Sequence, residues 1–366
     1  MADFLIYGAT GYTGSLIARE AAGRGLRPVL GGRSAEAVAA LGAELGLEHR
    51  AFPLDSSAAI AAGVRGVRAV LNCAGPFSRT ARPLADACLK TGTHYLDITG
   101  EAALLEAQAA RDQEARAAGV VLLPGVGFDV VPSDCLAAHL KRRLPTATRL
   151  ALAFRSAGRL SRGTALTALE GVADGGLVRK NGVLTRVPAA WKTRAIDFGD
   201  GQPVKAITIP WGDVATAYHS TGIPDVEVYL AAPWGLRAAA RLTRYAGWLV
   251  RRKVVQKWVG RRIRAGPPGP TADERRTNRC HLWGAVADPA GRTAVARQET
   301  PDGYDLTVQA ALAAVSRVLA GAVPAGYHTP ATAFGPNFVL ELPGVTRKDE
   351  STAPVSRPTG GPVRAE

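Results

Sequence analysis

A strand, turn and helix pattern at the start of the chain constrains the fold more than any other feature. The apolar run DFLIYG, residues 3–8, predicts a buried strand, and its last glycine opens the turn GATGYTG. Helical spacing of apolar residues begins at Leu16. In this context the first glycine permits a tight turn, the second lets the backbone approach a pyrophosphate, and the third lets the helix pack closely on the strand. The pattern predicts a dinucleotide-binding turn with contacts from Gly8, Thr10, Gly11, Tyr12, Thr13 and Gly14.

The end of the next predicted strand indicates which dinucleotide binds. Val29 and Leu30 lead into Gly31-Gly32-Arg33-Ser34. A site for NAD usually has an acidic residue about 20 residues after the glycines, where it bonds the ribose 2′-hydroxyl. Here the place is held by Arg33, a planar cation suited to a phosphate, with the Ser34 hydroxyl beside it. The sequence therefore predicts NADP(H) as cofactor, and a solvated surface arginine is the alternative interpretation.

Strands and helices keep alternating as far as residue 134, which predicts a parallel sheet with right-handed crossovers. Ligands of such sheets lie beyond the carboxyl ends of the strands. The stretch NCAGPF follows one predicted strand, at residues 72–77, and should lie along the nicotinamide half of the cofactor. Further cofactor contacts are therefore expected from Asp55, Asn72, Ala74, Gly75 and Pro76. We predict an α/β fold of the Rossmann type, a doubly wound parallel sheet with a second, mixed-sheet α/β domain.

Five motifs occur in a distinctive order: GATGYTG, GGRS, NCAGPF, HYLDITGE and PGVGFDVVPSD. Together they resemble the saccharopine dehydrogenase-like oxidoreductases, and most of all the bacterial branch that includes the trans-acting enoyl reductases. The stretches IPWGDVATAYHSTGIP, GPPGPTADERR and TPATAFG further along the chain are also similar to this group. The resemblance covers most of the chain, is most specific over residues 3–134, and is patchier over residues 135–260.

The resemblance implies a domain organisation and a cofactor. It implies an NADP-binding Rossmann domain over residues 1–134, to which residues 329–346 return. It also implies a second α/β domain over residues 135–328 for substrate binding and dimerisation. The polar tail 347–366, rich in Pro, Gly and Thr, is expected to be disordered. The group contains enoyl reductases and imine-forming reductases, so the resemblance leaves the substrate open.

Acidic and hydroxyl side chains near the predicted strand ends are the candidates for catalysis. The cofactor carries the hydride, so the protein needs to supply position, electrostatics and a proton. None of the eight tyrosines has a lysine four positions later, which argues against ketone reduction by a Tyr–Lys mechanism. The catalytic candidates are Asp129, Tyr95 and Asp97. Each aspartate could instead cap a helix or fix a turn.

Residues for the substrate are expected from the second domain and its junction with the first. Candidates are Ser133, Asp213, Tyr218 and His219. The last three lie in the stretch 211–221, which could be a substrate wall or a strand whose polar groups are satisfied internally. We expect no metal site, because the six histidines show no ligand spacing.

The segment 234–264 differs from the rest of the chain, with ten Arg or Lys, no Asp or Glu, and interleaved Trp and aliphatic residues. A basic helix that carries tryptophan is typical of peripheral contact with a membrane surface or of binding to an acidic partner. The alternative is a helix packed on the second domain, with its long cationic side chains covering apolar surface. No recognised nucleic-acid-binding module is present.

Three functional hypotheses follow. The first is an NADPH-dependent reductase of an acyl or lipid-like C=C bond, whose substrate is a small molecule or a carrier-bound chain. The second is an imine reductase or amino-acid dehydrogenase of the saccharopine type, which needs cations for the substrate carboxylates; Arg155 and Arg162 are the nearby candidates. The third is an NADP-binding regulatory or membrane-associated protein without turnover.

Composition and net charge predict where the protein is located and what kinds of partner it binds. Four cysteines without a CxxC pair in 366 residues indicate reduced thiols and a cytoplasmic location. Because the first predicted strand begins almost at Met1, we expect no cleaved leader, and no apolar run is long enough to span a bilayer. The net charge of +14 suits an anionic cofactor, an acidic partner or a membrane surface. A homodimer is expected, on the resemblance alone.

Overall fold

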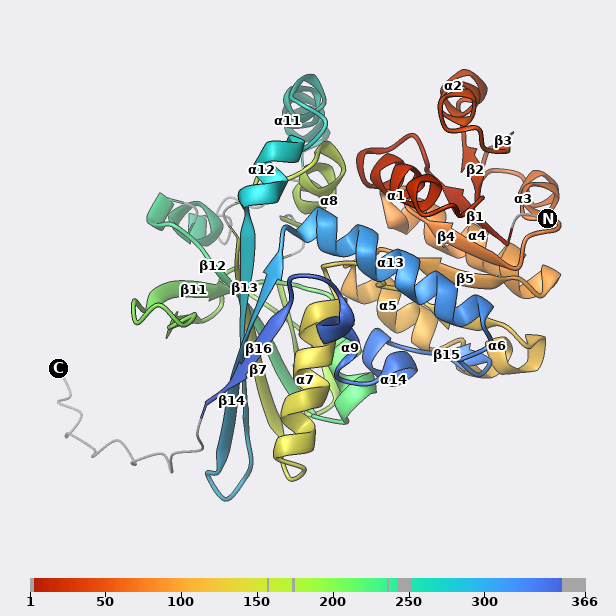
Figure 1. Ribbon diagram of the computed structural model, residues 1–366. Coiled ribbons are helices and arrows are strands. Elements are labelled where there is room, and N and C mark those ends of the chain that lie inside the picture. The colour runs from red at the N-terminus through yellow and green to blue at the C-terminus, as the bar shows by residue number, and fades with distance from the viewer. Residues whose placement is uncertain (1–2, 157, 173–174, 236, 243–251, 351–366) are drawn as a thin grey trace, which may run out of the picture.

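The computed structural model describes residues 3–156, 158–172, 175–235, 237–242 and 252–350. Two sheets stand side by side, with helices packed around the first and along one face of the second (Figure 1). The first sheet is built from the N-terminal third of the chain and one late strand, Gly326–Tyr327, and the second sheet from the middle and the C-terminal part. The predicted fold class, a Rossmann-type parallel sheet with a second mixed-sheet domain, is confirmed.

The first sheet is parallel throughout, in the order β15-β6-β5-β4-β1-β2-β3. Its inner strand β1 is buried along its whole length because the run Phe4–Tyr7 is apolar. From β1 the chain runs outward through β2 and β3, then crosses to β4 on the other side. A ligand site is expected above this reversal, between β1 and β4. The strands are β1 Phe4–Tyr7, β2 Val29–Gly32, β3 His49–Ala51, β4 Ala69–Asn72, β5 His94–Asp97, β6 Val121–Leu123 and β15 Gly326–Tyr327.

Helices cover both faces of this sheet. They are α1 Tyr12–Gly23, α2 Ala35–Leu45, α3 Ser57–Gly63, α4 Phe77–Thr91, α5 Ala102–Ala109 and α6 Asp112–Ala118. A further helix, α13 (Gly303–Leu319), lies beside α1 and across the sheet (Figure 1). Its residues Leu312 and Val315 share one buried cluster with Ile6 of β1 and Ile17 of α1.

The second sheet is mixed, in the order β10-β11-β12-β7-β13-β14-β16, with β8 and β9 attached beside β12. Its β12 and β7 run parallel and its other pairs are antiparallel. Helices α7 (Val131–Arg143) and α9 (Asp213–Thr221) bury their apolar sides against it. The strands are β7 Arg149–Ser156, β8 Gly176–Lys180, β9 Val183–Val187, β10 Thr193–Ile196, β11 Val204–Thr208, β12 Asp225–Ala231, β13 Arg279–Ala287, β14 Thr293–Pro301 and β16 Thr346–Asp349.

The remaining helices are short or lie at the margins. Helices α8 (Arg162–Val172), α11 (Lys253–Ala265) and α12 (Ala272–Thr277) gather beyond one end of the second sheet (Figure 1). Helix α14 (Pro330–Phe334) and the single 3₁₀ turn Phe338–Glu341 pack against α7. None of the helices in the described ranges combines the length and the apolarity needed to cross a bilayer.

The structure corrects two boundaries that were predicted from the sequence. The division at 134/135 falls inside α7, which packs on the second sheet. The range 135–328 was predicted as second domain, but α13 and β15 within it complete the first domain. Apolar spacing identifies a helix such as α13, but it does not identify the sheet that the helix covers. The chain therefore returns to the first domain at Gly303, not at Thr329.

Two further expectations also change. The disorder predicted from residue 347 is wrong for residues 347–349, which belong to edge strand β16. Polar side chains suit an edge strand of this kind, and Arg143 forms an ion pair with Asp349 at 3.2 Å. Residues 351–366 lie outside the described residues. The polar-strand interpretation of 211–221 is wrong as well, because Asp213–Thr221 is helix α9.

Candidate functional site

The glycine turn after β1 is shaped by contacts that leave no room for side chains. Gly8 has a φ of +83°, and a Cβ on it would lie 2.7 Å from the backbone nitrogen of Ala74. A Cβ on Gly14 would lie 2.2 Å from the carbonyl oxygen of Gly8. The first contact brings the turn close to the β4 loop, and the second brings α1 close to the turn. These are the roles predicted for the two glycines.

The start of α1 is left open for an anion. Gly11 is the residue that precedes the helix, so it supplies no side chain to cap the first N–H groups. The first turn of α1 also contains no acidic residue. Free N–H groups and the partial positive charge of the helix end are suited to a pyrophosphate. A backbone cradle that any Cβ would fill therefore fits the cofactor predicted from the sequence.

A cavity of about 400 Å³ lies over this turn. Residues of the first domain form one wall: Tyr7, Gly8, Thr10, Gly11, Tyr12, Thr13, Gly32, Arg33, Cys73, Ala74 and Gly75. Of the predicted cofactor residues, Gly8, Thr10, Gly11, Tyr12, Thr13, Arg33, Ala74 and Gly75 are thus brought together. Arg33 is exposed at the end of β2, where a 2′-phosphate is expected.

Four other predicted cofactor residues lie near the cavity but are not part of its lining. The Ser34 hydroxyl accepts a hydrogen bond from the Ala37 N–H at 3.3 Å and so caps α2. Asp55 is exposed on the loop before α3, outside the cavity lining. Pro76 precedes the first turn of α4. Asn72 is fully buried, and its Oδ1 accepts from the Ala74 N–H at 3.0 Å, which fixes the loop that lines the cavity.

Tyr95 and Asp97 belong to the same buried network as Asn72. The Asn72 amide donates to the Tyr95 hydroxyl at 3.2 Å, and that hydroxyl donates to Asp97 Oδ2 at 2.8 Å. Asp97 Oδ1 accepts from the N–H groups of Thr99 and Gly125, both at 3.0 Å. Neither side chain has any exposed surface, so this geometry gives both of them a positioning role. Their predicted catalytic role stays a prediction, and the geometry gives it no support.

The surroundings of Asp129 differ from those of Tyr95 and Asp97. It follows β6, and its carboxyl packs against Gly100, where a Cβ would lie 2.7 Å from Oδ2. Burial raises the pKa of Asp129 to about 7. The carboxyl has no hydrogen-bond or ion-pair partner among the described residues, whereas Asp97 has three hydrogen-bond donors. A carboxyl that is half protonated near neutral pH is suited to giving up a proton.

Two of the predicted substrate residues lie beside Asp129. Asp213, the first residue of α9, is fully buried, and neither of its oxygens has a hydrogen-bond partner. Burial raises its pKa, and the nearby Asp134 and Asp129 raise it further. Ser133 is near Asp213, and its hydroxyl donates to the Val130 carbonyl oxygen at 3.2 Å. The junction of α7 and α9 therefore concentrates carboxyl groups whose pKa values are raised by burial.

The other two predicted substrate residues lie elsewhere. Tyr218 and His219 are near the end of α9, and neither lines the cavity. His219 Nε2 lies 3.2 Å from a carboxylate oxygen of Glu106, and the Arg179 guanidinium lies over the Tyr218 ring at 4.3 Å. Arg179 and Glu106 form an ion pair at 2.5 Å. This group ties α5 of the first domain to β8 and α9 of the second.

The far wall of the cavity comes from the second domain, and sequence reasoning missed it. It consists of Ser161, Arg162, Gly163 and Pro268. In the sequence these residues lie far beyond Gly75, the last residue of the first-domain wall. No short sequence motif therefore contains residues of both walls. The motif GPPGPTADERR contains Pro268 and is the one sequence signal that points to this wall, although the motif alone predicts no role for it. Across the part of the chain that the structure describes, no group of three or more His, Cys, Asp or Glu is arranged to hold a metal ion.

Comparison with known protein families supports the cofactor reading. Residues 4–123 match the family described as saccharopine dehydrogenase NADP binding domain. The first domain is thus similar, over most of its length, to the NADP-binding domain of that family. NADP(H), predicted from Arg33 and the glycine turn, is thereby confirmed as the cofactor of this domain.

Two curated relatives of this chain are named trans-acting enoyl reductases. The trans-acting enoyl reductase of Mycobacterium leprae is 37% identical over 152 residues, which are 39% of this chain and 36% of that protein. The trans-acting enoyl reductase of Mycobacterium tuberculosis is 36% identical over 151 residues, 38% of this chain and 36% of that protein. The matched region thus spans little more than a third of the length of these relatives.

The whole chain has a counterpart among solved structures. The apo saccharopine dehydrogenase (L-Glu forming) of Saccharomyces cerevisiae superposes with a TM-score of 0.65 and 11% sequence identity. The match covers 96% of this chain and 100% of that one. At this identity the likeness shows that the NADP-binding domain and the second domain share the saccharopine dehydrogenase fold.

Proposed function

We propose that this protein is an NADPH-dependent reductase of the C=C bond in an acyl or lipid-like substrate, either free or bound to a carrier. The names of the curated relatives support this function, since both are trans-acting enoyl reductases. The observation that carries the proposal is the carboxyl of Asp129, which has no hydrogen-bond or ion-pair partner among the described residues and whose pKa burial raises to about 7. Asp129 directly follows Phe128, one ring of an aromatic surface.

The aromatic surface is formed by three rings. Phe128 lies beside Phe154 of β7 with ring centroids 6.4 Å apart, and Phe154 lies 4.7 Å from Trp211. Phe128 precedes Asp129 in the sequence, and Trp211 precedes the Gly212 that packs against Gly100. An apolar chain is suited to such a surface, because its burial against the rings removes it from water.

The reaction divides between cofactor and protein. When bound in the cavity, NADPH would supply the hydride for the carbon remote from the carbonyl group. The adjacent carbon then needs a proton, and we propose the protonated carboxyl of Asp129 as its donor. Asp129 is left as a carboxylate and recovers its proton from water. One hydride and one proton saturate the bond, so the atoms balance.

The imine reductase hypothesis requires cations that hold substrate carboxylates. Of its two candidates, Arg155 forms an ion pair with Asp200 at 2.8 Å. Arg162 lines the cofactor cavity instead of the region beside Asp129. The enoyl substrate is therefore preferred, since it needs no such clamp.

The test compares substrates on the purified protein. NADPH consumption is followed with a 2-enoyl thioester of pantetheine, and separately with a 2-oxo acid mixed with an amino acid. We expect turnover of the thioester, reduced roughly 100-fold or more in Asp129→Asn and unchanged in Asp273→Asn, an exposed carboxyl on α12. Turnover of the imine mixture alone would support the saccharopine-type alternative. Binding of NADPH with no consumption in either assay would support the non-catalytic regulatory alternative.

A second part of the proposal concerns where the protein works. We propose a cytoplasmic protein that meets an anionic membrane surface through α11. Val254 and Trp258 on the outer side of this helix are 77% and 61% exposed. Lys257 and Arg261 are exposed beside them, and the Arg262 guanidinium lies 5.3 Å from the centre of the Trp258 ring. The aromatic residues Tyr245 and Trp248 that supported this prediction from sequence lie outside the described residues.

Vesicle binding tests this contact. We expect co-sedimentation with vesicles that contain an anionic lipid, no binding to zwitterionic vesicles, and loss of binding in the double variant Lys257→Glu, Arg261→Glu. The pair Arg65→Glu, Arg79→Glu, on the first domain, is the control with equal charge change. Binding to an acidic acyl carrier protein without any vesicle binding would favour the partner-protein alternative. The predicted homodimer stays a prediction.

A further inference from the structure

The second-domain wall of the cofactor cavity places an arginine opposite the glycine turn. Arg162 begins α8, and its backbone N–H donates to the Pro268 carbonyl oxygen at 3.0 Å. Its Nε donates to the Gly266 carbonyl oxygen at 2.7 Å. The side chain is thus anchored at one nitrogen while its two terminal nitrogens remain available to the cavity that it lines.

The charges around the cavity have one sign. Two guanidinium groups, Arg33 and Arg162, belong to the lining, and no Asp or Glu does. Arg33 makes no ion pair or side-chain hydrogen bond with another described residue. A dinucleotide with a 2′-phosphate presents two separate anionic groups, the pyrophosphate and the 2′-phosphate. Two cations on opposite walls match such a ligand better than one.

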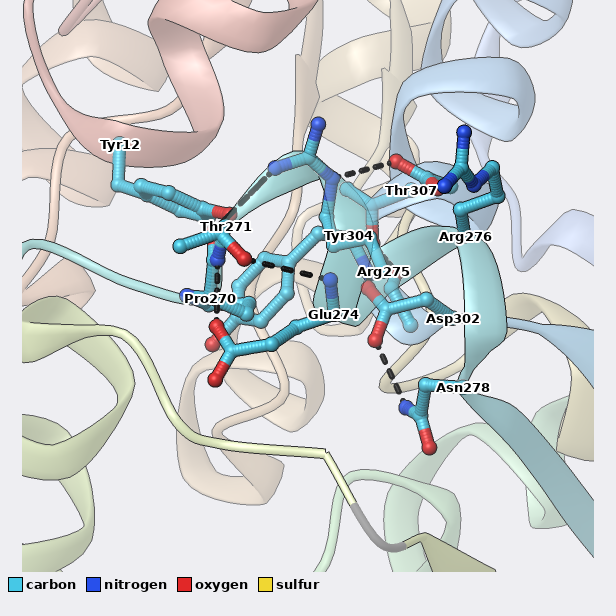
Figure 2. Close-up of polar contacts among 12 residues, drawn as sticks. Tyr12, Pro270, Thr271, Glu274, Arg275, Arg276, Asn278, Asp302, Tyr304 and Thr307 are labelled. Carbon is cyan, nitrogen blue, oxygen red and sulfur yellow. Dashed lines mark hydrogen bonds and ion pairs between the residues drawn. The ribbon is translucent and has the colours of Figure 1, made fainter.

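A contact near α1 fixes which phosphate faces Arg162. Tyr12, the first residue of α1, packs its ring against Gly269, where a Cβ would lie 2.6 Å from the ring. Its hydroxyl donates to the Pro270 carbonyl oxygen at 2.6 Å and accepts from Arg275 Nη1 at 2.9 Å. Figure 2 shows Tyr12 and Arg275 pointing toward one another above Pro270. The segment that carries Arg162's two carbonyl partners is therefore held directly over the start of α1, where the pyrophosphate is expected.

A second contact secures α8 itself. The Tyr304 hydroxyl accepts from the Ser161 N–H at 2.5 Å, and its ring meets Tyr12 edge-on with centroids 5.0 Å apart. Arg275 also forms an ion pair with Asp305 at 2.7 Å. Tyr12 of α1, Arg275 of α12 and Tyr304 of α13 thus lie together (Figure 2), and Tyr304 bonds to Ser161, the residue before Arg162.

We propose that Arg162 is a cofactor-binding residue, which contacts the pyrophosphate of NADP(H) from the second domain, while Arg33 contacts the 2′-phosphate. The dinucleotide is then enclosed between both domains. This inference rests on the NADP-binding domain and does not depend on the acyl substrate, so it can fail or hold independently of the enoyl reductase proposal.

Cofactor titrations distinguish the two arginines. Nicotinamide fluorescence is followed as the purified protein is titrated with NADPH and, separately, with NADH. Because both dinucleotides have a pyrophosphate, Arg162→Gln is expected to weaken both to a similar extent, about tenfold. Arg33→Ala is expected to weaken NADPH only. Arg162→Lys should recover part of the loss, because it keeps the charge without the planar fork.

Arg159→Gln is the matched control. Arg159 lies three positions before Arg162, is 56% exposed, pairs with Glu274 at 3.5 Å, and does not line the cavity. The Arg159→Gln substitution removes the same charge from the same segment, so we expect this variant to bind NADPH and NADH as tightly as the wild type does. The proposal is overturned if Arg162→Gln binds both dinucleotides as the wild type does, or if Arg159→Gln loses as much. A loss for NADPH alone would place Arg162 at the 2′-phosphate and contradict the assignment to the pyrophosphate.

Discussion

The hydroxyl of Tyr12 donates a hydrogen bond to the carbonyl oxygen of Pro270, 258 positions later in the chain, at 2.6 Å. Tyr12 directly follows Gly11 of the cofactor turn, and Pro270 ends the segment that covers the cavity. One side chain therefore belongs to the cofactor turn and also ties the two domains together. Perturbing it should affect stability and cofactor exchange at the same time.

Removing this hydroxyl is the most direct perturbation. Tyr12→Phe keeps the ring against Gly269 but loses the bonds to Pro270 and Arg275. We expect the free energy of unfolding to fall by about 1 kcal/mol and NADPH to dissociate faster in stopped-flow experiments. Tyr229→Phe, which loses a hydroxyl bonded to Glu227 in the second sheet, is the control. Equal NADPH dissociation rates in Tyr12→Phe and the wild type would contradict the covering role of the segment.

Two glycines of α1 give a paired test of the turn geometry. Gly14→Ala would place a Cβ 2.2 Å from the Gly8 carbonyl oxygen, so the turn must move. We expect loss of NADPH binding in fluorescence titrations and a lower melting temperature. Gly23→Ala, at the end of the same helix, meets nothing within 4 Å and should be neutral or stabilise by up to about 1 kcal/mol. If Gly14→Ala binds NADPH normally, the close approach of α1 to the turn is not needed for binding.

The raised pKa of Asp129 predicts a specific dependence of stability on pH. Its pKa is about 7 in the folded protein against a usual value of 3.8, so the folded state binds the proton more tightly than the unfolded state. Stability contributed by the protonated carboxyl is fully present below pH 4 and is lost as the pH rises toward 7, with a total on the order of a few kcal/mol. Asp129→Asn should reduce this decline.

Urea unfolding at pH 5 and pH 8 measures the effect. The wild type should lose more stability between the two pH values than Asp129→Asn does. Asp97, whose pKa burial raises to about 6, should contribute a decline of the same sign that persists in the variant. An identical pH dependence in both proteins would show that Asp129 is ionised normally, and would also remove the main argument for its role as proton donor.

The buried arginine of β8 should be important for the contact between domains. Arg179 is 2% exposed, and besides Glu106 it donates to the carbonyl oxygens of Val214 and Gly182 at 2.8 and 2.7 Å. Arg179→Met would leave these acceptors unsatisfied, and we expect a loss of about 2 kcal/mol or more in chemical unfolding. Arg149→Met, at an exposed position of β7, is the control and should change stability little. A comparable small change in Arg179→Met would mean that water replaces the lost donors.

The parts of the site that were predictable from the sequence are the local ones. The turn after β1 requires Gly8, Gly11 and Gly14 at fixed spacing, so the sequence alone locates it. Arg33 directly follows the next strand, so its place is also predictable from the sequence. Ser34 illustrates the limit, because a residue before a helix can cap it or bind a phosphate. Here the hydroxyl accepts from the Ala37 N–H, a choice that local pattern does not determine.

The parts that could not be predicted depend on contacts between distant segments. Helix α13 has the spacing of a core helix, but only the folded chain shows that it covers the first sheet. The wall that contains Arg162 is another such case, since its position follows from the packing of Gly269 on Tyr12. Tyr95 and Asp97 lie at a strand end as predicted, yet their side chains point into a closed hydrogen-bond network.

The return of the chain to the first domain at α13 has a consequence for synthesis. A ribosome releases β1 to β6 long before Gly303–Leu319 and the edge strand Gly326–Tyr327. During that interval the sheet face that Leu312 and Val315 later cover is open to water, with Ile6 and Ile17 beneath it. The nascent NADP-binding domain therefore waits until the second sheet has been translated as far as β14 before its apolar face can close, and in that period it exposes apolar surface of the kind that promotes aggregation.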